Sequence, residues 1–120
     1  QKTLDSYLNK TPQSDSFPIL QGDLHLFIGL RLCYETESYI FVHAGLRPKV
    51  PLASQESEDM LWIRDKFIYS KYNFGKPVVF GHTPLEKPLV ESNKIGIDTG
   101  AVYGNALTCV QLPDMLFFSA

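Results

Sequence analysis

The sequence predicts a mixed α/β (α+β) fold with more strand than helix. Short runs of β-branched and aromatic residues recur along the chain, and glycine, proline or small polar residues end each run. Two of these runs stop at a histidine, His43 and His82. Side chains at the carboxyl ends of strands face the crevice where open α/β sheets bind ligands. The two histidines are therefore the first candidates for a functional site.

Length and composition suit one globular domain. The chain has 120 residues, of which 44% are hydrophobic and 20% charged. A net charge of −2 gives no general attraction to nucleic acid or to acidic lipid. No apolar stretch approaches the roughly 20 residues that span a bilayer, and the first nine residues lack the features of a secretion signal. We expect a cytoplasmic protein with neither nucleic acid nor a membrane as its partner.

Cys33 and Cys109 are the only cysteines, and both stand in apolar surroundings. So few cysteines do not make a disulfide framework. We predict two buried free thiols, which agrees with a reducing compartment.

The first half of the chain predicts two helices and a β-hairpin. Residues 3–8 are expected to form a short amphipathic helix, and residues 9–16 a loop. Apolar residues lie near helical spacing over residues 21–30. Residues 32–36 and 39–42 are predicted to pair as a hairpin, and the second of these strands is nearly all apolar, as expected when both faces are covered.

The second half predicts one helix followed by strands. Residues 47–55 read as a loop, Ser54 is expected to cap the next helix, and apolar residues over 61–68 give that helix a broad apolar face. A turn at residues 73–76 leads to the later strands. These strands are predicted at residues 77–80 and 95–97, and a carboxyl-terminal hairpin at 106–112 and 115–118.

The histidine pair favours a metal site over two unrelated core residues. A lone histidine more often bonds a backbone carbonyl in the core, and His25, in the predicted helix, is taken as packed or exposed. His43 and His82, however, occupy matching positions, each after an apolar run and within two residues of a glycine. Neutral imidazole suits zinc, manganese or iron. Two imidazoles are still fewer than the roughly three protein ligands of a catalytic zinc site.

Four other residues have both a functional and a structural interpretation. Arg64 is either a fork for phosphate oxygens or an exposed helix residue paired with an acid. Arg47 has a weaker claim to the same phosphate-binding role. We expect Asp98 to shape its own loop by binding backbone amides rather than to act in catalysis. Tyr103 is either a site residue or a half-buried turn tyrosine.

Four stretches together resemble the carboxyl-terminal half of a bacterial serine/threonine protein phosphatase of the calcineurin-like metallophosphoesterase superfamily. They are residues 39–48, 61–64, 78–84 and 95–101. The His-Ala-Gly and Gly-His-Thr-Pro elements, in this order, are the specific part. The resemblance implies a β-sandwich flanked by helices that holds two divalent metal ions, commonly manganese, iron or zinc.

The resemblance also implies roles for individual residues. His43 and His82 would both bind one ion of the pair. Arg64 would be the catalytic residue that contacts the substrate phosphate, and Tyr103 would lie over the site and help to bind the substrate. A metal-bound water would then attack phosphorus in line.

The family's first metal-binding elements do not occur in their expected places, and with them the general acid histidine and the bridging aspartate are missing. Asp23 and His25 resemble the first element only superficially. We therefore expect residues 1–120 to be the carboxyl-terminal portion of a single metallophosphoesterase domain whose amino-terminal half is missing. Such a chain would hold a partial metal site at most.

Four functions are compatible with these observations. The first is hydrolysis of phosphoserine or phosphothreonine in proteins, or of a small phosphoester, by the intact protein. The alternative enzyme is a dinucleoside polyphosphate hydrolase, because related enzymes share these loops. A third is a non-catalytic fragment that acts as a binding module, with its own missing amino-terminal half as one partner. The fourth is a small α/β domain with two structural histidines.

Overall fold

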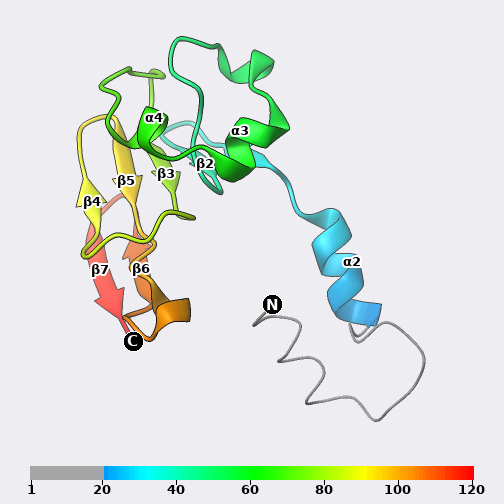
Figure 1. The fold of residues 1–120 in the computed structure, drawn as a ribbon, viewed down its shortest axis with the longest axis vertical. Coiled ribbons are helices and arrows are strands. Elements are labelled where there is room, and N and C mark those ends of the chain that lie inside the picture. Colours follow the sequence, from blue (N-terminus) through cyan, green and yellow to red (C-terminus); the bar gives the residue numbers. More distant parts are fainter. Residues whose placement is uncertain (1–20) are drawn as a thin grey trace. The chain divides into compact units, whose positions relative to one another are not determined.

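The computed structural model describes residues 21–120, which fall into two compact units that divide between Arg31 and Leu32 (Figure 1). In the described part of the first unit, helix α2 (Gln21–Gly29) confirms the helix predicted over 21–30. His25 in α2 is exposed and Asp23 is half-buried. The helix and loop predicted at 3–8 and 9–16 lie outside the described residues.

A five-stranded mixed sheet organises the second unit, with the strand order β1-β2-β3-β5-β4. Strands β1 and β2 pair antiparallel, which confirms the predicted hairpin, whereas β2, β3 and β5 run parallel. The sequence did not predict β4, which has only two residues and pairs antiparallel with β5. The strands are β1 (Cys33–Glu35), β2 (Ile40–Val42), β3 (Val78–Phe80), β4 (Leu89–Val90) and β5 (Lys94–Gly96).

A separate two-stranded sheet follows at the carboxyl end (Figure 1). Strands β6 (Thr108–Gln111) and β7 (Leu116–Ser119) pair antiparallel, with Thr108 opposite Ser119. This confirms the predicted hairpin. The short 3₁₀ helix η2 (Ala101–Tyr103) lies between β5 and this hairpin. Sheets and helices together confirm the mixed α/β fold.

The single helix predicted to follow Ser54 and to carry the apolar residues 61–68 is wrong, because the chain forms two short helices there. Helix α3 (Ser57–Trp62) ends where Ile63 takes extended backbone angles, and α4 (Asp65–Ile68) begins after Arg64. The break places the side chain of Ile63 in the core, where it is 8% exposed. Apolar spacing alone does not reveal such an interruption, because Ile63 is apolar in either arrangement.

Ser54 does not cap α3. It ends the 3₁₀ helix η1 (Leu52–Ser54), while Glu56 precedes α3 and makes no side-chain capping bond.

The core lies between one face of the sheet and the two short helices, which cover that face in Figure 1. Alternate residues of β2 and β3 face these helices, as strand geometry requires. Central parallel strands are normally covered, so these strands are apolar. The main core residues are Ile40, Val42, Val78 and Phe80 from the sheet, with Ile63, Phe67 and Ile68 from the helical segment.

The cysteine prediction is half right. Both thiols are free, and Cys33 is half-buried, so that burial raises the pKa of its thiol. Cys109 is exposed, because it lies on a strand of the two-stranded sheet with its side chain turned to solvent. Within residues 21–120, no helix has the length and apolar character that crossing a bilayer requires.

Candidate metal and phosphate site

The structure brings His43 and His82 together. Because β2 and β3 are adjacent and parallel, the residues that follow them leave the sheet at the same edge. Nε2 of His43 lies 3.0 Å from Nδ1 of His82, and the ring centroids are 4.8 Å apart. The amide of Gly81 also donates a hydrogen bond of 2.8 Å to the carbonyl of His43. The two loops are therefore joined by main chain as well as by their rings.

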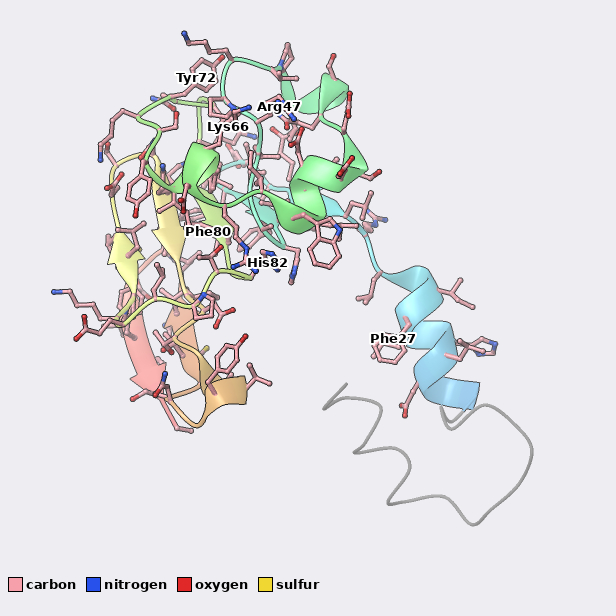
Figure 2. The ribbon with its side chains drawn as sticks, in the orientation of Figure 1. Phe27, Arg47, Lys66, Tyr72, Phe80 and His82 are labelled. Carbon is pink, nitrogen blue, oxygen red and sulfur yellow. The ribbon has the colours of Figure 1, made fainter. Side chains whose placement is uncertain are left out.

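His82 has an unusual backbone conformation, with φ of +67°. Residues other than glycine rarely adopt this left-handed backbone region. Holding a residue in it costs on the order of 1–3 kcal/mol of conformational free energy, and such residues cluster at functional sites. The outlier falls on one of the two residues that the sequence singled out. Figure 2 shows His82 just beyond Phe80, the last residue of β3.

The surroundings of His82 favour the neutral imidazole. Burial lowers its pKa most, and the charges of His43 and Arg64 lower it further, whereas Asp98 acts in the opposite direction. Metal ions bind the neutral form of histidine. The electrostatics of the site thus keep His82 in the form that a metal requires.

The donor set fits one metal ion in part. Two nitrogens that each lie about 2.1 Å from a shared ion, at a right angle, are about 3.0 Å apart, which matches the observed spacing. Nε2 of His82 is buried and has no hydrogen-bond partner among the described residues, and a metal-binding histidine usually donates its second N–H to such a partner. Residues 21–120 contain no group of three or more His, Cys, Asp or Glu residues that could hold an ion.

Trp62 and Arg64 flank the buried Ile63 in the chain, and both act on His82. Arg64 is exposed, and its charge acts on the imidazole of His82. The ring of Trp62 is 66% exposed and meets that of His82 edge-on, with centroids 5.5 Å apart. Sequence reasoning assigned Trp62 only to the apolar face of a helix and missed this contact, because it depends on the break after α3.

Arg47, the weaker candidate for phosphate binding, pairs with a carboxylate in this structure. Its Nε and Nη2 donate to the carboxylate of Asp59 over 2.6 and 2.9 Å, and this pairing raises the pKa of the guanidinium. Gln55 closes the same loop by accepting from the amide of Arg47 and donating to its carbonyl. Figure 2 shows Arg47 well apart from His82. Arg47 therefore stabilises the loop after His43.

The loop after β5 carries the remaining candidates. The amide of Gly100 donates a hydrogen bond of 2.9 Å to Oδ1 of Asp98, and the carbonyl of Asp98 accepts one from the amide of Leu85. These bonds confirm that Asp98 shapes this loop. Tyr103 ends η2, and its side chain is 69% exposed. A substrate-binding role for Tyr103 stays a prediction.

A solved structure shares the fold of this chain. A crystal structure whose protein carries the provisional name diadenosine tetraphosphatase superposes with a TM-score of 0.70. The match covers 99% of this chain and 60% of the other, with 20% sequence identity. At that identity, the similarity establishes the fold alone.

Sequence similarity identifies particular relatives, all named bis(5'-nucleosyl)-tetraphosphatase PrpE [asymmetrical]. The protein of Geobacillus thermodenitrificans is 50% identical over 38 residues, which are 32% of this chain and 16% of the relative. That of Oceanobacillus iheyensis is 48% identical over 42 residues, or 35% and 17% of the two chains. The matched segment spans less than a fifth of either relative. No family model matches the chain.

Proposed function

We propose that the intact protein is a metal-dependent hydrolase of phosphoric anhydrides, with a dinucleoside polyphosphate as its substrate. The observation that carries this proposal is the convergence of His43 and His82 to 3.0 Å, with the charge of the exposed Arg64 acting on His82. The names of the sequence relatives and of the structural neighbour favour a dinucleoside substrate over a phosphorylated protein.

The residues of this chain have distinct tasks in the proposed reaction. His43 and His82 hold one of two divalent ions, and Arg64 binds phosphoryl oxygens and offsets the negative charge that grows on them. A bound divalent ion lowers the pKa of a coordinated water and so supplies hydroxide near neutral pH. The oxygen of water bonds to phosphorus while the bridging P–O bond breaks. The bonding electron pair leaves with the nucleotide, and the released protons pass to product oxygens or solvent.

Further ligands must complete the site, because two imidazoles are too few. We place them outside residues 21–120, in another part of the intact protein. Manganese, iron and zinc all suit imidazole with oxygen ligands. The proposed domain, of which residues 1–120 form the carboxyl-terminal portion, remains a prediction.

Hydrolysis of phosphoserine or phosphothreonine in proteins is the second candidate. The four stretches that resemble a bacterial serine/threonine phosphatase favour it. The exposure of His43 and Arg64 also suits a phosphate presented on a large surface.

A substrate comparison with the intact protein and manganese separates these two functions. Diadenosine tetraphosphate should be cleaved to mononucleotides with a higher kcat/KM than a phosphoserine peptide, measured by chromatography of nucleotides and by release of inorganic phosphate. The reverse order would favour the protein phosphatase. Cleavage of neither substrate would refute both.

Loss of either imidazole should remove turnover and weaken metal binding together. His43→Ala and His82→Ala in the intact protein each delete a proposed ligand, and we expect at least about a 100-fold loss of kcat. Manganese affinity, measured by calorimetry, should fall in the same variants. The matched control is His25→Ala, in α2, which should leave both quantities unchanged. Full metal affinity in His43→Ala would contradict the assignment.

A further inference from the structure

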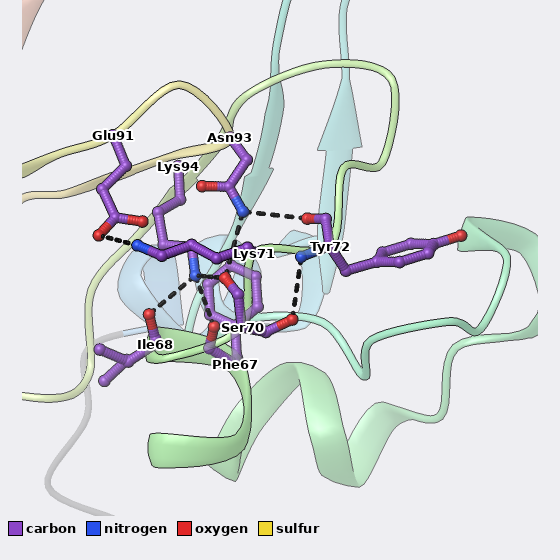
Figure 3. Close-up of polar contacts among 8 residues, drawn as sticks. All are labelled: Phe67, Ile68, Ser70, Lys71, Tyr72, Glu91, Asn93 and Lys94. Carbon is purple, nitrogen blue, oxygen red and sulfur yellow. Dashed lines mark hydrogen bonds and ion pairs between the residues drawn. The ribbon is translucent and has the colours of Figure 1, made fainter.

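Lys94, at the start of β5, is a fully buried lysine whose ammonium group binds main-chain carbonyls (Figure 3). Its Nζ donates to the carbonyl oxygens of Phe67 at 2.6 Å, Ile68 at 2.8 Å and Ser70 at 2.5 Å. Lysine is almost never fully buried unless it is paired. Here the pairing is with the end of α4 and the segment after it.

Lys94 has a neighbour that acts on the same segment. The amide of Asn93 donates to the carbonyls of Ser70 and Tyr72 over 3.2 and 3.0 Å (Figure 3). Together, Asn93 and Lys94 bind four carbonyls, two in the last turn of α4 and two in the segment after it. Carbonyls at a helix end lack intrahelical partners, and leaving them unsatisfied is costly where water is excluded. The carbonyl of Phe67 also accepts from the amide of Ser70.

Arg64, the residue proposed to bind phosphate, lies at the other end of α4. The carbonyl of Arg64 accepts from the amides of Phe67 at 2.8 Å and Ile68 at 3.0 Å. The carbonyls of these same two residues bind Lys94. Phe67 and Ile68 therefore link the buried ammonium group to the backbone of Arg64.

Phe67 connects the same lysine to both histidine loops. The Nζ of Lys94 lies 4.8 Å above the Phe67 ring, which packs edge-on against Phe80 with centroids 5.0 Å apart. Phe80 precedes His82 by two residues. On its other side, the Phe67 ring fills the space where a side chain at Gly45 would lie, two residues after His43.

We propose that Lys94 is a positioning residue for the site. By fixing the carbonyls at the end of α4, it sets the direction of Arg64 and the placement of Phe67 between the loops of His43 and His82. This inference rests on the proposed function for its activity readout and adds to it a residue that touches neither substrate nor metal.

A double-mutant cycle in the intact protein tests the proposal. Lys94→Met keeps the length and volume of the side chain and removes its donors. We expect kcat to fall at least about tenfold with KM changed less than about twofold, and the loss to become smaller when Arg64→Ala is already present, because only the effect through the histidine loops then remains. Lys71→Met, which removes an exposed lysine paired with Glu91, is the matched control and should retain full kcat. All variants are compared below their melting temperatures.

Two outcomes overturn the proposal. One is a folded Lys94→Met protein with the kcat of the parent, and the other is an equal loss with and without Arg64→Ala. If Lys94→Met does not fold, the same double-mutant cycle is made with Lys94→Gln, because the glutamine side chain is shorter than lysine but keeps two N–H donors. An intermediate loss that depends on Arg64 is then expected.

A measurement without turnover separates this inference from the proposed function. In nuclear magnetic resonance spectra, the imidazole signals of His43 and His82 and the Nε–H signal of Arg64 should shift in Lys94→Met and stay in place in Lys71→Met. If the parent protein cleaves no phosphate compound, the proposed function fails while these spectra still decide the role of Lys94. Unmoved signals in Lys94→Met refute the positioning role.

Discussion

At the scale of single residues, the candidate site combines the imidazoles of His43 and His82 with the guanidinium group of Arg64. The pKa of His82 is lowered mainly by burial, and the charge of Arg64 acts in the same direction. A permanent positive charge next to an imidazole disfavours a second positive charge on the ring. In the proposed function, Arg64 would thus both attract phosphate and help to keep His82 neutral for a metal.

Arg64→Ala should lower kcat/KM of the intact protein by about 30- to 1000-fold, which corresponds to about 2–4 kcal/mol of lost transition-state stabilisation. Arg64→Lys should recover only part of the loss, because an ammonium group keeps the charge but not the planar fork. Steady-state kinetics on diadenosine tetraphosphate provide the measurement. Unchanged kinetics in Arg64→Ala would remove the residue from the site.

The sequence predicts a site residue best where its place at the end of an apolar strand determines its position. His43 and His82 were predicted to converge because both follow apolar strands, and they do. Lys94 could not be found in this way. A lysine at the start of a strand is usually solvated, and only the tertiary structure reveals that three carbonyls surround it.

At the scale of elements, the break between α3 and α4 determines the shape of the site. A continuous helix would place Trp62, Ile63 and Arg64 about 100° apart around its axis. The extended backbone at Ile63 instead buries that residue and leaves Trp62 and Arg64 exposed on either side of it. The amide of Ala44 also donates to the carbonyl of Met60, in α3, at 2.8 Å. The loop after His43 is thereby fixed to the same helix.

Gly45→Ala should destabilise the fold by at least about 1–3 kcal/mol, the usual range for overpacking a core. Gly45 has φ of +150°, and a Cβ there would overlap the ring of Phe67 and lie 2.9 Å from Cγ2 of Ile63. Chemical denaturation measures the change. Gly75→Ala is a partial control, because Gly75 also has positive φ but has open space around it. An equal loss in the two variants would attribute the effect to backbone strain alone.

At the scale of the whole molecule, one face of the larger sheet packs against helices, and the other carries a shallow hollow of about 240 Å³. Phe41, His43, Val79 and Ile97 are among the residues that line this hollow. The sequence predicted most strands and both hairpins, since these depend on local pattern and turns. It did not predict the strand order or the parallel pairing of β2, β3 and β5, which depend on contacts between distant segments.

The pH dependence of stability should reveal the buried lysine. Burial lowers the pKa of Lys94, with Lys71 acting in the same direction and Glu91 opposing it. Between this lowered pKa and the unfolded value of about 10.4, the unfolded chain binds more protons than the folded one. The free energy of unfolding of the parent, minus that of Lys94→Met, should therefore rise with pH through this window. Urea titrations at several pH values measure it, and a flat difference would contradict the prediction.

The hydrogen bond from Gly81 to the carbonyl of His43 has a consequence for how a cation would be captured. Neither histidine loop can swing independently, so both nitrogens are presented at a preset separation before any ion arrives. Part of the entropy of ordering the two loops is thus lost during folding and not at capture. Affinity at such a pair is sensitive to changes in the backbone behind it, even where no ligand is altered.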